Sequence, residues 1–289
     1  MSRDILTIAD LEPGALEAIL DLSTRADPGR PLAGKGVALV FQKPSARTRN
    51  SMEMATVQLG GHPVYIQKDE VGLGTRETAE DVARTLACYH SIICARVMDH
   101  RHLERMADAT GIPVANLLSD RDHPFQALAD LLTVKQLLGR LEGARIAWVG
   151  DADNNVARSL AQACVAVGAE LTLASPEGYR LSDPPYGVRH VTDPAEAVEG
   201  AEFVYTDVWV SMGQDDEAEA RRAAFAAYQV NEALMAQAGN AWFLHCLPAR
   251  RGEEVTHGVM ESPKSVVWRQ AENRMHTARG ALAWLAGVR

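Results

Sequence analysis

The stretch Phe41-Gln42-Lys43-Pro44-Ser45-Ala46-Arg47-Thr48-Arg49 places two arginines, a serine and a threonine where a strand turns into a helix. Residues 36–41 form an apolar run typical of a buried parallel strand, and residues 50–59 carry apolar side chains at helical spacing. Backbone N–H groups at such a turn are unpaired, and the helix dipole favours negative charge. The hydroxyl and guanidinium groups add further donors. The stretch therefore predicts a phosphate site, and the alternative is a helix cap with two solvated arginines.

The composition is that of an acidic globular protein. Of the 289 residues, 47% are hydrophobic and 23% are charged, and this length suits two domains. The 29 Lys and Arg residues against 38 Asp and Glu residues give a formal net charge of −9 and a pI near 5.5. This balance argues against nucleic acid or an anionic membrane as a partner. An anionic ligand must therefore be held by local positive charge.

The sequence carries no targeting or membrane signal. Its first residues lack the apolar core of a signal peptide, and no apolar run approaches the roughly 20 residues of a membrane span. The four cysteines are scattered and lack the spacing of metal ligands; they are Cys88, Cys94, Cys164 and Cys246. We therefore expect reduced thiols, no bound metal and a cytoplasmic protein.

Short apolar runs alternate with amphipathic stretches along the whole chain, which is the pattern of repeated βα units. Strands are expected at 37–41, 64–67, 92–95, 114–116, 145–149, 170–174, 188–191, 203–206 and 242–245. Helices are expected at 13–25, 48–59, 79–89, 100–110, 155–167, 218–225 and 231–238, with a long connecting helix at 124–138 and a last one from about 269. The pattern predicts an α/β fold of two doubly wound parallel-sheet lobes with a ligand cleft between them.

Polar side chains follow two strands in the first half of the chain. Arg96 comes directly after the apolar strand 92–95, where side chains tend to line a ligand crevice. His123 and Gln126 lie three residues apart at the start of the connecting helix, with Pro124 at a first helical position. They can bind a carbonyl and an amide. The alternatives are a salt bridge at the rim for Arg96 and a helix cap for His123.

Polar residues also follow strands in the second half. The turn 149–155 has one glycine where a dinucleotide-binding fold needs three, so a nicotinamide dehydrogenase is not favoured. Asn154 or Asn155 offers an amide to a polar ligand, or caps the next helix. Asp207 can hold an ammonium group, and the turn Ser211-Met212-Gly213 can present main-chain groups to a carboxylate. The alternative is a turn that an aspartate initiates.

Two further motifs lie near the end of the sequence. Cys246 is placed at a strand tip, where it can act as a nucleophile, orient a substrate or simply pack as a thiol. The bond Leu247-Pro248 is a candidate cis peptide, since cis bonds are tolerated before proline. Arg274 can reach a phosphate if the last helix packs back across the cleft; otherwise it is a solvated helix arginine.

In this order, the motifs resemble those of the transcarbamylase family, and most closely its ornithine branch. The matching segments run from residue 45 to residue 276 and are Ser45-x-Arg47-Thr48-Arg49, His123-Pro-x-Gln126, Leu128-Ala-Asp130, Asp207-Val-Trp-x-Ser211-Met212-Gly213, His245-Cys246-Leu247-Pro248 and Glu272-Asn-Arg274-Met-His276. The Asp207 and His245 motifs are the ones that look like the ornithine branch.

The resemblance implies an activity and an organisation. The activity is transfer of the carbamoyl group from carbamoyl phosphate to the δ-amine of L-ornithine, which gives L-citrulline and phosphate in arginine biosynthesis. The implied carbamoyl-phosphate domain is 1–133, with a C-terminal helix at 270–289 packing back onto it, and the implied ornithine domain is 134–269. The resemblance implies a homotrimer and no metal or organic cofactor. The alternatives are transfer to putrescine, lysine or acetylornithine, and a non-catalytic transcarbamylase-like binding subunit.

The resemblance also assigns roles to individual residues. The phosphate would contact Ser45, the main chain at Ala46, Arg47 and Thr48, and the carbamoyl end would contact Arg96, His123 and Gln126. Ornithine would contact Asn155, Asp207, Ser211 and Met212, while Cys246, Leu247 and Arg274 would lie where both substrates meet. The catalytic candidates are Arg96, His123 and Cys246.

The sequence departs from the family pattern at two positions. Ala46 replaces a threonine, a change that a main-chain contact survives and a hydroxyl contact does not. Gly72 stands where the family usually has a glutamine that reaches the phosphate, and glycine has no amide side chain to offer.

Overall fold

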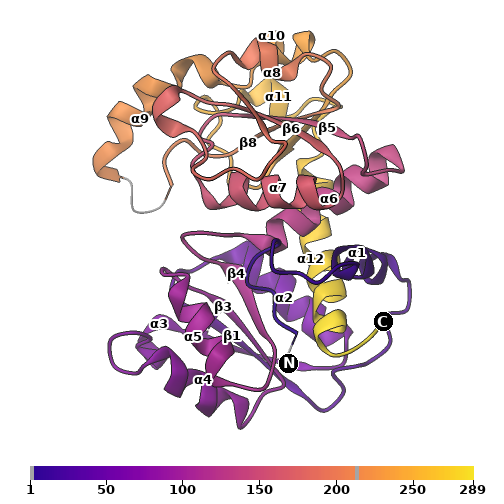
Figure 1. The fold of residues 1–289 in the computed structure, drawn as a ribbon, viewed down its shortest axis with the longest axis vertical. Helices are drawn as coiled ribbons and strands as arrows, with labels where there is room; N and C mark the ends of the chain where they lie inside the picture. The colour runs from indigo at the N-terminus through magenta and orange to yellow at the C-terminus, as the bar shows by residue number, and fades with distance from the viewer. Residues whose placement is uncertain (1–2, 212–214) are drawn as a thin grey trace. The chain divides into compact units, whose positions relative to one another are not determined.

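The computed structural model describes residues 3–211 and 215–289 (Figure 1). Two compact units form, one from Met1–Leu132 with Glu272–Arg289 and the other from Thr133–Ala271. Each unit is built on one sheet, and every strand pair within the two sheets is parallel. The predicted α/β class with two parallel sheets is therefore confirmed.

The sheet of the first unit has four strands in the order β2-β1-β3-β4. They are β1 (Gly36–Phe41), β2 (His62–Gln67), β3 (Ile92–Arg96) and β4 (Val114–Leu118). The strand order reverses between β1 and β3, where Phe41 pairs with Arg96 in register. Ligands of open α/β sheets bind outside the carboxyl ends of the strands at such a switch point.

The helices of this unit are α1 (Ala15–Thr24), α2 (Ala46–Gln58), α3 (Lys68–Val71), α4 (Ala79–Ala87) and α5 (Arg101–Ala109). Two longer helices, α6 (Pro124–Leu138) and α12 (Val267–Leu285), contribute residues to both units. The central strands β1 and β3 are buried on both faces, as is normal for parallel strands. On one face Ala38 and Val40 join a cluster with α4 and α5, while Val37 and Leu39 on the other face are also fully buried.

The sheet of the second unit has five strands in the order β7-β6-β5-β8-β9. They are β5 (Arg145–Val149), β6 (Glu170–Ala174), β7 (Arg189–Val191), β8 (Phe203–Thr206) and β9 (Trp242–His245). Its helices are α7 (Asn155–Ala166), α8 (Pro194–Val198), α9 (Ala218–Phe225), α10 (Glu232–Gln237) and α11 (His257–Met260), with 3₁₀ turns at Glu177–Tyr179, Asp215–Glu217 and Ala226–Tyr228. The switch point of this sheet lies between β5 and β8.

The core of the second unit follows the alternation of side chains along its strands. In β5, Ala147 and Val149 join one apolar cluster, whereas Ile146 and Trp148 join the other. Both faces of the sheet are therefore covered, which explains why the central strands read as continuous apolar runs.

The predicted elements agree with the structure except at some ends and at three short helices. The strands at 145–149, 170–174, 203–206 and 242–245 and the helices at 124–138 and 218–225 have the predicted bounds. The short helices α3, α8 and α11 were not expected, because four or five residues are too few to show a 3.6-residue period.

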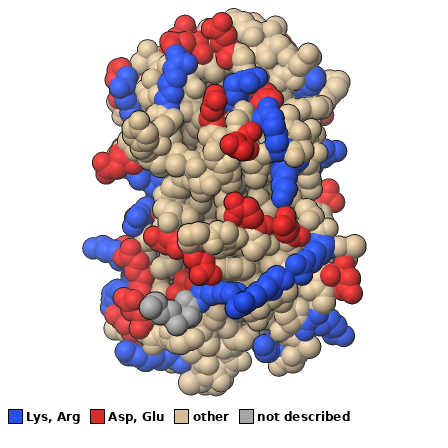
Figure 2. Space-filling model, turned by 45° about the vertical axis from the view of Figure 1, so that its right-hand side comes forward, with Lys and Arg blue, Asp and Glu red and all other residues tan. Residues whose placement is uncertain are grey.

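The surface mixes charges of both signs. On the face shown in Figure 2, Lys and Arg side chains lie among Asp and Glu side chains, and neither sign forms a continuous field. Within the described part of the chain, none of the helices is both long enough and apolar enough to cross a membrane.

Helix α12 lies directly against α1 at a glycine. A Cβ atom built on Gly280 would lie 2.5 Å from the carbonyl oxygen of Ile19 and 2.8 Å from the backbone nitrogen of Ser23. The Ser23 hydroxyl donates to that same carbonyl at 2.6 Å. The close approach of the two backbones therefore requires glycine at this position.

We expect Gly280→Ala to lower the free energy of unfolding by about 1–3 kcal/mol, because α1 must move to admit the methyl group. The better helix propensity of alanine, about 1 kcal/mol, offsets only part of this loss. Denaturant unfolding measures the difference. Gly111→Ala is the control, since its Cβ would meet nothing within 4 Å, and equal stability of the two variants would contradict the prediction.

Candidate active site

The nonapeptide forms the turn from β1 into α2. Ser45 is the N-cap of α2, and its hydroxyl oxygen accepts a hydrogen bond from the Thr48 backbone N–H at 3.3 Å. The two hydroxyl groups are also 3.1 Å apart. Ser45 therefore caps the helix, as one of the sequence interpretations had it. Ala46 and Arg47 follow at the first helical positions and are exposed.

The decisive feature of the first unit is a group of arginines that repel one another. Arg96 ends β3 with only 6% of its surface exposed, and its buried Nε has no hydrogen-bond partner in the described structure. Burial, together with the positive charges of Arg274 and Arg47, lowers the pKa of Arg96 to about 10. Like charges disfavour the charged form of a group in the same way that burial does. Cations that repel one another in this way are suited to bind an anion.

Arg274 joins three helices of the first unit at this point. It is 7% exposed, and its Nη1 donates to the Gln126 side-chain oxygen at 3.2 Å. Nη1 lies 3.5 Å from Nε2 of His123, and Nη2 lies 3.5 Å from the Thr48 hydroxyl. The structure therefore brings together residues that are up to 226 positions apart in the chain.

His123 is neutral at this site. Burial holds the pKa of His123 well below its ordinary value, and the charges of Arg274 and Arg96 add to the effect. Gln126 is oriented by its own amide, whose nitrogen donates to Asp130 at 2.8 Å, so that its carbonyl oxygen faces Arg274. A neutral imidazole and an amide beside two guanidinium groups offer hydrogen bonds for a polar but uncharged part of a ligand.

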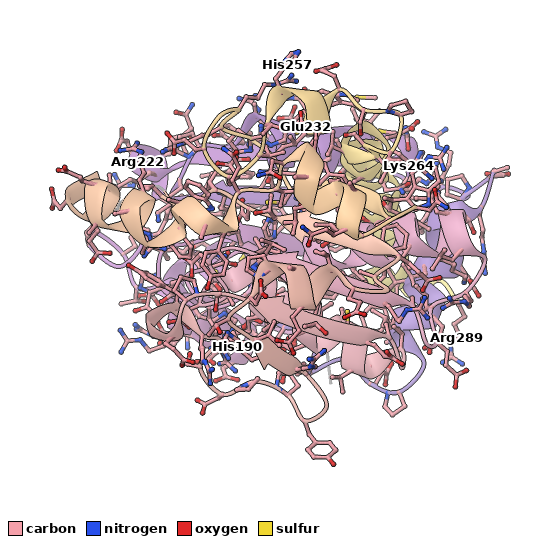
Figure 3. All side chains as sticks on the ribbon, turned by 90° about the horizontal axis from the view of Figure 1, so that it is seen from above. His190, Arg222, Glu232, His257, Lys264 and Arg289 are labelled. Carbon is pink, nitrogen blue, oxygen red and sulfur yellow. The ribbon has the colours of Figure 1, made fainter. Side chains whose placement is uncertain are left out.

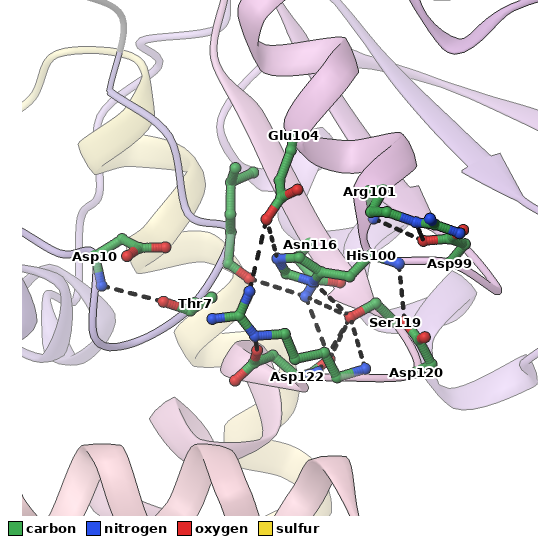
Figure 4. A network of polar contacts seen from close by, with 12 residues as sticks. Thr7, Asp10, Asp99, His100, Arg101, Glu104, Asn116, Ser119, Asp120 and Asp122 are labelled. Carbon is green, nitrogen blue, oxygen red and sulfur yellow. Dashed lines mark hydrogen bonds and ion pairs between the residues drawn. The ribbon is translucent and has the colours of Figure 1, made fainter. Parts of the chain in front are cut away.

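A buried polar network holds the turn that precedes His123 (Figure 4). The Ser119 hydroxyl accepts from the backbone N–H of Asp122 at 3.1 Å and lies 2.8 Å from Nδ1 of His100. The Asn116 amide donates to the Ser119 hydroxyl at 3.3 Å and to the Asp122 carbonyl at 3.2 Å. Because these groups are fully or almost fully buried, they fix the turn and with it the start of α6.

The loop after α3 explains the glycine at position 72. Gly72 ends α3 in the left-handed conformation with φ of 58°, and its backbone N–H donates to Lys68. A Cβ atom at Gly72 would lie 2.7 Å from the Cβ of Arg76. A glutamine at this position would therefore be strained both by its backbone conformation and by its neighbour.

The second unit presents a buried carboxylate at the end of β8. Asp207 is 9% exposed and accepts hydrogen bonds from the Val208 backbone at 2.8 Å and from the Cys246 thiol at 3.0 Å. Burial raises the pKa of Asp207, although the hydrogen bonds from Cys246 and Val208 act in the opposite direction. The two donors are uncharged, so the carboxylate is suited to bind a cationic group.

Other sequence candidates lie at the same edge of the second sheet. Asn154 is the N-cap of α7, where its side chain accepts from two backbone N–H groups at 2.9 Å, and Asn155 is the first helical residue. Ser211 is half-buried after β8, and Met212 lies outside the described residues. Because β5 and β8 are neighbours, Asn155 and Asp207 follow adjacent strands.

The segment after β9 has an unusual backbone. The Leu247-Pro248 bond is cis, as the sequence suggested, and Leu247 has a left-handed φ of 60°. The Leu247 N–H donates to Nδ1 of His245 at 2.9 Å, and Nε2 of His245 lies 3.1 Å from the buried Glu254 carboxylate. Sequence reasoning missed Glu254, because nothing in the sequence marks it as the partner of His245, nine residues earlier.

The side chains of Asp207, His245 and Cys246 form a group with metal-ligand chemistry. Their ligand atoms lie within 4.8 Å of one another. However, Nδ1 of His245 accepts from a backbone N–H, so the ring proton is on Nε2, which donates to Glu254. Neither ring nitrogen therefore offers a lone pair to an ion. The donor set fits an ammonium group better than a metal.

Comparison with known proteins identifies the family. The model described as "Aspartate/ornithine carbamoyltransferase, carbamoyl-P binding domain" matches residues 3–136, and "Aspartate/ornithine carbamoyltransferase, Asp/Orn binding domain" matches residues 142–285. The chain belongs to the aspartate/ornithine carbamoyltransferase family, which confirms the resemblance found in the motifs.

The most similar relatives that we compared carry the name of the ornithine branch. The ornithine carbamoyltransferase of Hyperthermus butylicus is 46% identical, covering 97% of this chain and 96% of the relative. That of Thermus thermophilus is 45% identical, covering 99% and 97%. The structure of ornithine carbamoyltransferase from Pyrococcus furiosus superposes with a TM-score of 0.94 at 42% identity, covering 100% of this chain and 98% of that one.

Replacing Arg274 by glutamine removes one of the mutually repelling guanidinium groups. We expect the unliganded Arg274→Gln variant to be at least as stable as the wild type, while inorganic phosphate no longer raises its Tm. Phosphate at about 100 times its Kd stabilises a protein that binds it by about 2.7 kcal/mol. Thermal unfolding with and without phosphate measures both effects. Arg105→Gln, which alters an exposed arginine paired with Glu80, serves as control. A phosphate response that survives in Arg274→Gln would exclude this guanidinium from the site.

Replacing Asp207 by asparagine removes a buried charge and keeps an acceptor for Val208. The pKa of Asp207 in the folded protein is above the ordinary 3.8. Ionisation of this carboxyl group therefore destabilises the fold: with respect to this group, the protein is most stable at low pH, where the group is protonated, and loses stability as pH rises. We therefore expect Asp207→Asn to have a higher Tm than the wild type at pH 7, and the difference to shrink as pH falls towards 4. A Tm difference that does not change with pH would contradict this assignment. The exposed Asp108→Asn variant is the control.

Proposed function

We propose that this protein transfers the carbamoyl group from carbamoyl phosphate to the δ-amine of L-ornithine, giving L-citrulline and phosphate for arginine biosynthesis. The observation that carries the proposal is the pair of buried guanidinium groups, Arg96 and Arg274, beside the N-terminus of α2. Family membership and the names of the relatives support the same activity.

The phosphate group would lie at the start of α2. Ser45, the main chain of Ala46, Arg47 and Thr48 would bind its oxygens, together with Arg274. A helix N-terminus and several arginines are the usual means of binding a dianion. Position 72 would not contribute to the phosphate site, because it is a glycine in the left-handed conformation and has no side chain.

The carbamoyl end would face Arg96, His123 and Gln126. Attack by the amine forms a C–N bond, builds negative charge on the carbonyl oxygen and then breaks the C–O bond to phosphate. The buried Nε–H of Arg96 and the neutral imidazole of His123 would donate hydrogen bonds to that oxygen. Loss of one such donor typically costs about 100- to 1,000-fold in rate.

Ornithine would occupy the second unit. Asp207 would hold its α-ammonium group, with Asn155, Ser211 and Met212 near the α-carbon end. Cys246 and Leu247 would lie close to both substrates, and the hydrogen bond from Cys246 to Asp207 favours an orienting role for this thiol over a nucleophilic one.

The attacking amine must be neutral, although a free alkyl ammonium has a pKa of about 10.4. A desolvated site favours the neutral amine, and the departing phosphate can take the proton. Much of the rate would then come from holding two small substrates in line. We propose that residues 1–133 with 270–289 serve carbamoyl phosphate and residues 134–269 serve ornithine. A cytoplasmic homotrimer completes the proposal and rests on the family resemblance.

The purified protein is expected to form citrulline from carbamoyl phosphate and ornithine in a colorimetric assay, with far less product from putrescine, lysine or acetylornithine. Arg96→Gln should reduce the turnover by about 100- to 1,000-fold, because a donor to the carbonyl oxygen is lost. If product forms only with one of the other amines, that amine is the second substrate in place of ornithine. Calorimetric binding of both ligands without product would indicate a non-catalytic binding subunit.

A further inference from the structure

A buried ion pair in the second unit has no place in the proposed chemistry. Arg221 on α9 is 5% exposed, and Asp151 after β5 is 4% exposed. Nη2 of Arg221 donates to Oδ2 of Asp151, and Nε donates to the carbonyl oxygen of Trp209 at 2.6 Å. The guanidinium plane also lies over the rings of Tyr179 and Phe225, at 5.0 and 5.6 Å from their centroids.

Arg221 also lies 3.6 Å from the exposed Glu217 carboxylate, but the two groups that accept its hydrogen bonds belong to two different loops. Asp151 lies in the loop that leads from β5 into α7, whose first residue is Asn155. Trp209 lies midway between Asp207 and Ser211 in the segment that follows β8. Through Asp151 and Trp209, Arg221 reaches the segments that carry Asn155 and Asp207. It holds the backbone that carries them.

Asp151, which Arg221 holds in place, is in turn hydrogen-bonded to the residues at the start of α7. Its Oδ1 accepts from the Asp153 backbone at 3.0 Å, and its carbonyl oxygen accepts from the side chains of Asn154 and Trp148, both at 2.9 Å. Asn154 is the cap of α7, so a movement of Asp151 would move the helix start.

Two more contacts join the same loops. The Thr206 hydroxyl donates to the Val149 carbonyl at 2.6 Å. The Trp209 indole lies against Gly150, where a Cβ atom would come within 3.6 Å of the indole nitrogen. The loops that follow β5 and β8 are therefore linked to each other at the switch point of the sheet. Arg221 contributes a charged group to this link, through its hydrogen bonds to Asp151 and to the Trp209 carbonyl.

We propose that Arg221 is a positioning residue for the amino-acid substrate, which fixes the spacing between the Asp207–Ser211 segment and Asn155. The inference rests on the proposed function. A buried ion pair is a poor source of stability, since its desolvation cost can exceed the attraction. The planar guanidinium group of Arg221, by contrast, fixes the relative positions of the two loops, because it donates to a carboxylate and to a carbonyl in fixed directions. A lysine ammonium has no such fork.

Arg221→Lys tests this role, because it keeps the charge and removes the fork. The expected result is a rise in the ornithine KM of roughly 10- to 100-fold, the size of effect that small misplacements of a binding group produce. The carbamoyl-phosphate KM should stay within about two-fold of wild type, because that substrate binds the other unit. Arg222→Ala is the matched control: this arginine, labelled in Figure 3, is the next residue on α9, is exposed and pairs with Glu253, and its variant should behave as wild type.

Asp151→Asn is the second variant, and it decides the question if Arg221→Lys does not fold. It keeps an acceptor for Asp153 and weakens the hold on Arg221, so the same selective rise in ornithine KM is expected. A lower Tm with an unchanged ornithine KM, or an equal change in both KM values, overturns the inference in favour of a purely structural role. If the wild-type protein forms no citrulline, the proposed function is wrong. The inference about Arg221 is then wrong as well, because it rests on that function.

Discussion

The repulsion between Arg96 and Arg274 is the constraint around which the first unit is arranged. Both guanidinium groups are almost fully buried, and each lowers the stability of the other's charged form. They are held in place by the rest of the fold: Arg96 by its register with Phe41 in the sheet, and Arg274 by hydrogen bonds to α6 and α2. The fold itself therefore fixes both guanidinium groups, and donors fixed in this way need little reorganisation when they bind an anion.

The second unit holds the opposite charge in a similar way. Asp207 is buried with uncharged donors, and burial raises its pKa. Each unit therefore contains a buried charge that the fold neutralises only in part. The charge is positive in the first unit and negative in the second. Proteins accept such losses of stability mainly where function requires them. The signs match a phosphorylated substrate and an amino-acid substrate that bears an ammonium group.

The sequence predicted the sheets well because their signal is local. Fully buried strands such as β5 and β8 appear as short apolar runs, and polar residues directly after them must lie at one edge of a parallel sheet. That rule placed Arg96 and Asp207 at strand ends, and the motif pattern placed His123 and Arg274.

What the sequence did not reveal depends on partners that are distant along the chain. Arg221 and Asp151 are 70 residues apart, and Arg221 lies outside every motif described above. Glu254 is equally inconspicuous, although it fixes the proton on His245. Residues of this kind are defined by the shape of the folded core, which periodicity and capping rules do not encode.

The late position of Arg274 has a consequence for protein synthesis. Thr48 and Arg96 leave the ribosome long before residue 274 is added, and N-terminal segments begin to fold during translation. A nascent chain that ends before residue 274 therefore contains Arg96 and Thr48 without the guanidinium group of Arg274. The first unit brings its two buried guanidinium groups together only when α12 has docked onto it, and the residues of α12 that belong to this unit are made after all of the second unit.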